Sequence, residues 1–287
     1  MAKQKLTKSQ RVEIARDKAA QMRARKAQEQ KKQRVLVGII VGIIVLAVVG
    51  LIVGIAIYRS SLPKDYSQSQ GKDQDIATMK SLDHPAGMTD DGGILVGKDG
   101  LNKPTPGAIK VDNFSDFGCI ACRVVDTKIR GDLEKYIQDG KINFIIHPVA
   151  TPWLAKAFTD GYTSRMTGAA LYIYQNDPEH FLDFFYGVFA DESLPIDSKP
   201  DGSSAAYPFS DSDIQQLAAK LGVKPDVAAK CTDGQYKDYV TASAAYFSGL
   251  ISGLTGVGTP YFLVNDERLP RNVDVLTQIK NLTGEAK

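Results

Sequence analysis

Cysteine is scarce in this chain of 287 residues, which contains only Cys119, Cys122 and Cys231. A structural zinc site usually takes its four ligands from two Cys-x-x-Cys pairs, and the second pair is absent, so we expect no metal site. The sequence also lacks a Gly-x-Ser-x-Gly elbow, a phosphate-binding Gly-Lys-Ser/Thr loop and a Gly-x-Gly-x-x-Gly fingerprint. These absences argue against an esterase-type hydrolase, a P-loop nucleotidase and a dinucleotide-dependent dehydrogenase.

Acidic residues are rare at the start of the chain. Residues 1–34 carry twelve Lys and Arg against three acids, a net charge of +9, so residues 35–287 carry −7 of the total of +2. No aromatic residue interleaves the basic ones, and we therefore do not expect nucleic-acid binding. We interpret this segment as a basic cytoplasmic tail that touches anionic lipid headgroups.

Charge is wholly absent from residues 35–57, a run of 23 apolar and glycine residues. As a helix this run would be about 35 Å long, enough to cross a hydrocarbon core of about 30 Å. We predict a single transmembrane helix in the lipid bilayer; a cleaved signal peptide is the alternative, although its apolar region is usually about 7–15 residues long. Because Lys and Arg beside a span stay cytoplasmic, we expect residues 58–287 outside the cytoplasm, anchored to the cell membrane.

The part beyond the predicted span has the pattern of an α/β domain with a helical insertion. Residues 58–92 are polar and turn-rich and predict an extracytoplasmic linker. Alternating and apolar runs predict strands at residues 94–97, 107–114, 141–148 and 259–266. The helix predicted from about Cys119 has apolar residues at three- and four-residue steps. We expect a first α/β part over 93–150, a helical insertion over 151–252 and a second α/β part over 253–287.

The Cys-x-x-Cys pair follows a predicted strand and begins a predicted helix. At that position, unpaired backbone N–H groups and the helix dipole stabilise a thiolate, and can lower a thiol pKa below its ordinary value of about 8.5. Cys122 lies one turn further along the same face, so the pair can alternate between dithiol and disulfide. A purely structural disulfide would close a very short loop and stabilise the fold weakly. We therefore predict redox chemistry, in which Cys119 is attacked and Cys122 resolves the mixed disulfide.

Two segments carry a resemblance to a known family. "KVDNFSDFGCIACR" (residues 110–123) and "GVGTPYFLVND" (residues 256–266) resemble the DsbA-like branch of the thioredoxin superfamily, over about residues 90–285. The resemblance implies a thioredoxin-like fold with an inserted all-helical domain and a protein disulfide oxidase that needs no cofactor besides the Cys119–Cys122 disulfide. It further implies unfolded, cysteine-containing secreted or surface proteins as substrates and a reoxidising partner in the membrane.

The resemblance also assigns roles to single residues. It implies a cis peptide bond between Thr259 and Pro260 beside the cysteines, where a substrate strand would pair with the backbone of Thr259. Ala121 stands where strongly oxidising members have His, and Asn113 stands where many relatives have a buried carboxylate. Asp116 is then either a cap of the active-site helix or part of a proton relay.

Two other functions remain open from the sequence. A reductase or isomerase would use the same pair with electrons flowing in the opposite direction, and a non-catalytic binding module would use the same fold to hold unfolded chains. Cys231 is expected to be a buried, unreactive thiol. His147 is expected to be a satisfied histidine at the edge of the sheet.

Overall fold

A computed structural model describes residues 68–158, 160–191, 209–269 and 273–285. The chain divides into two units, Met1–Lys64 and Asp65–Lys287, and the described residues belong to the second. The predicted basic tail and the predicted transmembrane helix lie outside the described residues. Within the described part, no helix combines the length and the apolar character needed to cross a membrane.

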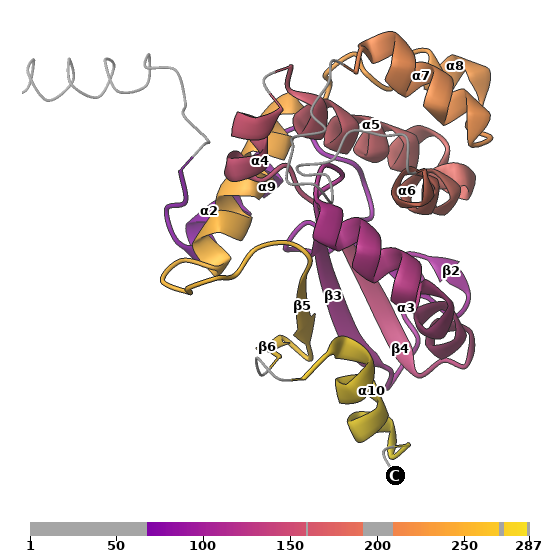
Figure 1. The fold of residues 1–287 in the computed structure, drawn as a ribbon, viewed down its shortest axis with the longest axis vertical. Helices are drawn as coiled ribbons and strands as arrows, with labels where there is room; N and C mark the ends of the chain where they lie inside the picture. Colours follow the sequence, from indigo (N-terminus) through magenta and orange to yellow (C-terminus); the bar gives the residue numbers. More distant parts are fainter. Residues whose placement is uncertain (1–67, 159, 192–208, 270–272, 286–287) are drawn as a thin grey trace, which may run out of the picture. The chain divides into compact units, whose positions relative to one another are not determined.

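The described part of the second unit is built around a six-stranded sheet with the strand order β2-β1-β4-β3-β5-β6 (Figure 1). The two central strands, β3 and β4, run parallel, and every other pair of neighbours is antiparallel. The strands are β1 (Ile94–Gly97), β2 (Gly100–Leu101), β3 (Ile109–Ser115), β4 (Ile142–Pro148), β5 (Tyr261–Val264) and β6 (Glu267–Arg268).

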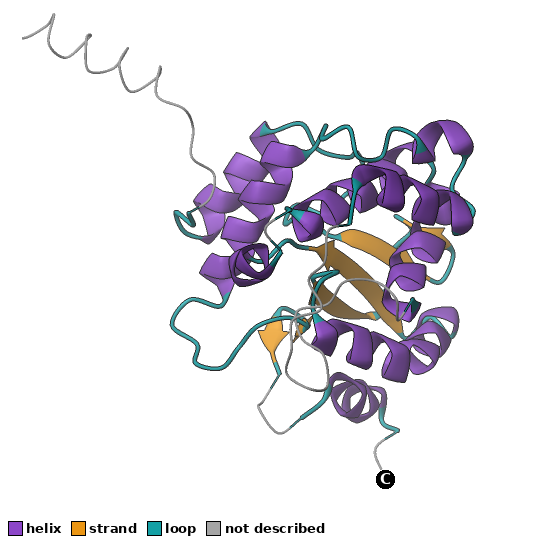
Figure 2. Ribbon diagram, turned by 45° about the horizontal axis from the view of Figure 1, so that its top comes forward, coloured by secondary structure: helices purple, strands orange, loops and turns teal. Residues whose placement is uncertain are grey.

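A long helix, α3 (Ile120–Gln138), makes the crossover between the parallel strands β3 and β4, a connection that parallel strands require. It buries Ile129 and Leu133, two of the apolar residues that predicted it. A second helix, α10 (Val275–Thr283), contacts both α3 and β5. Figure 2 shows helices packed on both sides of the sheet.

Side chains of β3 point alternately to the two faces of the sheet. Asn113 and Ser115 face α3, where they share a small enclosed space with Cys122. Phe114 faces the opposite side and stacks on Phe247 of α9 (Lys237–Leu250), with ring centroids 5.2 Å apart. The cysteine-bearing helix α3 and helix α9 of the insertion therefore pack on the same central strand, from opposite faces.

The helices between β4 and β5 form the predicted insertion. One of its contacts with the α/β part is made by Phe117, whose ring stacks on Phe189 and meets Phe184 and Phe185 edge-on. The described helices are α4 (Pro152–Ala157), α5 (Tyr162–Asn176), the 3-10 turn η1 (Pro178–His180), α6 (Phe181–Ala190), α7 (Asp211–Lys220), α8 (Pro225–Ala228) and α9.

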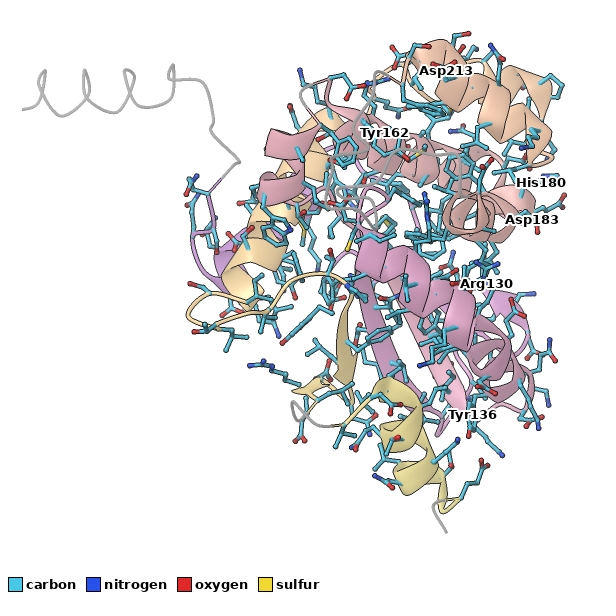
Figure 3. All side chains as sticks on the ribbon, viewed as in Figure 1. Arg130, Tyr136, Tyr162, His180, Asp183 and Asp213 are labelled. Carbon is cyan, nitrogen blue, oxygen red and sulfur yellow. The ribbon has the colours of Figure 1, made fainter. Side chains whose placement is uncertain are left out.

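Arg130 of α3 makes a second contact between the α/β part and the insertion. Its guanidinium group donates a hydrogen bond to the carbonyl oxygen of Tyr186, lies 4.5 Å from the centre of the Tyr186 ring and pairs with Asp126 one turn earlier. Figure 3 shows Arg130 on the side of α3 that faces α6. The turn before Cys119 and the middle of α3 are thus both held against α6.

The structure differs from the sequence-based expectation between β1 and the first unit. Residues 72–81, part of the predicted linker, form helix α2 (Lys72–Ser81), which contacts α9. Its buried residues are Met79 and Asp75, whose carboxylate accepts hydrogen bonds from Ser69 Oγ at 2.6 Å and from the backbone N–H of Gln70 at 2.8 Å. Since one of the two buried positions is a carboxylate, the sequence shows no apolar stripe there.

Candidate active site

Cys119 occupies the N-cap position of α3, with extended backbone dihedrals, and its sulfur accepts a hydrogen bond from the backbone N–H of Cys122 at 3.4 Å. This contact places the sulfur at the positive end of the helix dipole, where negative charge is stabilised. The pair is in the dithiol form. Cys119 is 6% exposed and Cys122 only 1% exposed, so the first sulfur is the more accessible one.

The segment before β5 supplies the second side of the site. The peptide bond between Thr259 and Pro260 is cis, the geometry that the family resemblance implies. The thiol of Cys119 donates a hydrogen bond to the carbonyl oxygen of Thr259 at 3.3 Å. The structure therefore brings together the two predicted segments, although the insertion separates them in sequence.

The thiol of Cys122 is more deeply buried than that of Cys119. Burial raises its pKa well above the ordinary cysteine value, and the neighbouring Cys119 adds to this increase. The nearby polar groups of Asp116 and Thr259 act to lower this pKa, but they do not outweigh burial. Cys122 is consequently held as a neutral thiol in the dithiol form.

Asp116 is completely buried behind the cysteine pair. Its Oδ1 accepts a hydrogen bond from Gly118 N at 2.9 Å, and its Oδ2 accepts two from Thr151, from N at 2.7 Å and from Oγ1 at 2.9 Å. Burial raises the pKa of Asp116 to about 7, against the effect of these hydrogen bonds. Because the N-cap of α3 is Cys119, the alternative of Asp116 as the helix cap is wrong.

Thr151 is the residue that sequence reasoning missed. It comes three residues after β4, while Asp116 comes directly after β3. Since β3 and β4 are parallel neighbours, the residues that follow them meet at the same edge of the sheet. The two predicted strands therefore contained the signal that a polar residue after β4 would lie beside the cysteine loop.

Asn113 and Ala121 are the two positions at which the sequence departs from the family pattern. Asn113 is buried, and its Oδ1 accepts a hydrogen bond from Ser115 Oγ at 2.9 Å, so the position facing Cys122 carries a neutral amide. Ala121 is exposed on the first turn of α3, and its side chain offers neither a charge nor a hydrogen-bond donor to the sulfurs. A protonated histidine at that position would have added positive charge near Cys119.

A separate polar cluster lies on the other face of β3. His147 is buried on the central strand β4, not at the edge of the sheet as expected, and its Nε2 lies 2.9 Å from Asp112 Oδ1. Together with Asp91 these residues form the one group of potential metal ligands found among the described residues. The ammonium group of Lys110 lies 3.4 Å from Asp112 Oδ2 and already supplies a positive charge there.

The third cysteine is remote from this chemistry. Cys231 follows α8 in the insertion and is 2% exposed. Burial raises the pKa of its thiol to about 12. This agrees with the expectation of a buried, unreactive thiol.

Comparison with known proteins identifies a matching family and solved structures with a similar fold. Residues 106–280 match the thioredoxin family, and no curated protein sequence matches the chain. The MdbA thiol-disulfide oxidoreductase from Actinomyces oris superposes with a TM-score of 0.52 at 18% identity, over 77% of this chain and 98% of that one. MdbA from Corynebacterium diphtheriae gives 0.53 at 19% identity, over 70% and 93%. Oxidised BdbD from Bacillus subtilis gives 0.50 at 20% identity, over 71% and 98%.

These likenesses confirm the thioredoxin-like α/β fold with its helical insertion, the architecture of the DsbA-like proteins to which the sequence was related. The matched family region includes the Cys-x-x-Cys pair, the cis Thr259–Pro260 bond and most of α10. It covers more than half of the chain. The chain belongs to the thioredoxin family.

Proposed function

We propose that this protein is a thiol-disulfide oxidoreductase that introduces disulfide bonds into secreted or surface proteins through a Cys119–Cys122 cycle. The observation that carries the proposal is the position of the Cys119 sulfur, which lies at the N-terminus of α3 and 3.3 Å from the Thr259 carbonyl oxygen. This sulfur is more exposed than that of Cys122, lies at the positive end of a helix and is in contact with the backbone of Thr259.

The cycle starts from the Cys119–Cys122 disulfide. A substrate thiolate attacks Cys119 Sγ, the S–S bond breaks, and its electron pair goes to Cys122, which takes up a proton because burial favours the neutral thiol. A second substrate thiolate then attacks the substrate sulfur of the mixed disulfide. The substrate leaves with a new disulfide, Cys119 leaves as a thiolate, and the enzyme retains two electrons as a dithiol.

Thr259 has a role in both halves of this cycle. In the dithiol form its carbonyl oxygen accepts the hydrogen bond from the Cys119 thiol. When Cys119 is part of a disulfide it has no S–H to donate, so the carbonyl is available to a backbone N–H of an extended substrate, as in other strand-addition complexes. Substrate pairing is thereby coupled to the redox state of Cys119.

Asp116 acts as a positioning residue in this proposal. The hydrogen bonds that its carboxylate accepts tie the turn before Cys119 to Thr151, which follows β4. A carboxyl group that titrates near neutral pH and interacts electrostatically with Cys119 is also the candidate for the proton relay that Asn113 does not provide. The two roles differ in their consequences, because only a relay would change the pH dependence of the resolving step.

The location and the partners follow from the sequence and form part of the same proposal. The basic residues 1–34 and the uncharged residues 35–57 would anchor the protein with its catalytic domain outside the cytoplasm, where substrate disulfides persist. Each catalytic cycle leaves the enzyme reduced, and a reoxidising partner in the same membrane would restore the disulfide.

The redox equilibrium with glutathione tests the direction of electron flow. A disulfide donor should have a reduction potential nearer to those of protein disulfide isomerase, about −180 mV, and DsbA, about −120 mV. A potential near that of thioredoxin, about −270 mV, would reject the oxidase and favour a reductase. Ala121 makes this test informative, because the position carries no charge to stabilise the reduced form.

A further inference from the structure

A groove lies beside the Thr259–Pro260 peptide, between α3, α10 and the chain around β5 and β6. Its volume is about 730 Å³, and its floor includes the apolar side chains of Val125, Ile129, Val257 and Leu276. Figure 1 shows α3, β5 and α10 as neighbours around this region. The groove thus begins at the backbone that lies against Cys119 and continues along an apolar surface.

The rim of the groove is positively charged. Lys128 of α3, Arg268 of β6 and Lys280 of α10 line it, are exposed, and make no ion pair within the described part of the chain. Asp274 is the only acid among the described lining residues. Both of its carboxylate oxygens accept hydrogen bonds from Thr277, at 2.9 Å and 2.8 Å, at the first turn of α10.

This positive charge is opposite in sign to the charge of the surrounding chain. Residues 35–287 sum to −7, whereas three cations and one carboxylate give the groove a net charge of +2. Neighbouring cations without acidic partners repel one another, and an anion bound between them relieves that repulsion. A positive cleft in an acidic domain attracts acidic ligands and repels basic ones.

We propose that this groove selects substrate segments in which acidic side chains flank an apolar side chain close to the reacting cysteine. The inference rests on the proposed function and adds a substrate class to it. A segment joined to Cys119 and paired with Thr259 continues into the groove. Its apolar side chain packs on Val257 and Leu276, and its carboxylates approach Lys128 and Arg268.

Three peptides of equal length test the proposal. Each contains one cysteine and one leucine, flanked by Glu, by Gln or by Lys. The rate at which each peptide thiol opens the Cys119–Cys122 disulfide is measured and normalised to its rate with a small-molecule disulfide, which removes differences in thiol ionisation. We expect the Glu peptide to react on the order of tenfold faster than the Lys peptide at low ionic strength, with the difference largely lost at about 0.5 M salt.

Charge-reversal variants locate the effect. Arg268→Glu combined with Lys280→Glu should reverse the order, so that the Lys peptide becomes the faster one. Lys230→Glu combined with Lys237→Glu is the matched control, because both lysines are exposed and neither lines the groove. This control should keep the wild-type order. The same order in both variants would overturn the proposal.

A binding measurement separates this inference from the proposed function. The same peptides with Ser in place of Cys are labelled, and their affinity for the oxidised protein is measured by fluorescence anisotropy. Glu-over-Lys preference supports the groove even when no thiol peptide reacts, a result that would reject the proposed function alone. Equal binding and equal reactivity of the three peptides would overturn the inference and leave the proposed function intact.

Discussion

The thiol of Cys119 and the carbonyl oxygen of Thr259 lie 3.3 Å apart across 140 positions of sequence. The sheet explains this proximity, because β3 leads into the cysteine turn, β5 follows Pro260, and the two strands pair directly, with Phe114 opposite Tyr261. The helical insertion enters after β4 and returns before β5. A domain can therefore be inserted between the two halves of the site without separating them.

Alkylation of the reduced protein should distinguish the three cysteines. Iodoacetamide at pH 7 should modify Cys119 first, and Cys122 and Cys231 more than about tenfold more slowly, since burial raises the pKa of both thiols and only thiolates react. Mass spectrometry of the digested protein measures the three rates. In denaturant the rates should become similar. Equal rates in the folded protein would contradict the assignment of Cys119 as the reactive sulfur.

Asp116 should make the protein less stable as the pH rises towards neutrality. Its pKa in the folded state, about 7, lies above its ordinary value of 3.8, so the stability it contributes is complete below about pH 4 and is lost as the pH rises to about 7. The loss is of order 4 kcal/mol, at about 1.4 kcal/mol for each pH unit between the two values.

Asp116→Asn isolates this contribution, because the variant has no charge to bury. The free energy of unfolding of the wild type, minus that of Asp116→Asn, should decrease from pH 4 to pH 7 in urea titrations. Asp213→Asn is the control of opposite sign: hydrogen bonds from Ser210 lower the pKa of Asp213, so its contribution is lost as the pH falls. A pH-independent difference for Asp116→Asn would show that its carboxyl group titrates normally.

The sequence predicted those elements in which burial follows a simple period. β3 and β4 were found from runs of alternating or apolar residues, and α3 from its stripe at three- and four-residue steps. Helix α2 was missed because Asp75 is one of its two buried residues. Its burial depends on hydrogen bonds from Ser69 and Gln70, and a search for periodic apolar residues does not detect such bonds.

The same distinction applies to the site. Local motifs located Cys119, Cys122, Thr259 and Pro260, because each segment carries a recognisable pattern of its own. Thr151, the partner of Asp116, is 35 residues away and belongs to no motif, so only the pairing of β3 with β4 indicates that a polar residue after β4 lies there. The cations of the groove come from three elements and converge only in the folded protein.

The buried pair of Asp112 and His147 should be energetically coupled. Replacing one member, as in His147→Phe or Asp112→Leu, removes a partner from a buried hydrogen-bonded pair and should cost about 3 kcal/mol of unfolding free energy. The double variant should cost clearly less than the sum, because neither Asp112 nor His147 is then left buried without the other. In the wild type the ring centroids of His147 and Phe114 are 4.1 Å apart. His147→Phe therefore keeps an aromatic ring against Phe114. Additive costs would contradict the coupling.

The most direct test of the account uses a Cys122→Ala variant whose Cys119 has been loaded with thionitrobenzoate. A single-thiol substrate peptide should displace the thionitrobenzoate and remain joined to Cys119 in a stable mixed disulfide, since Cys122 is absent and cannot resolve it. With Cys122 present the complex should be short-lived, and Cys119→Ala should form none. A complex that persists equally in the presence of Cys122, or one that forms in Cys119→Ala, would contradict the assigned roles of the two cysteines.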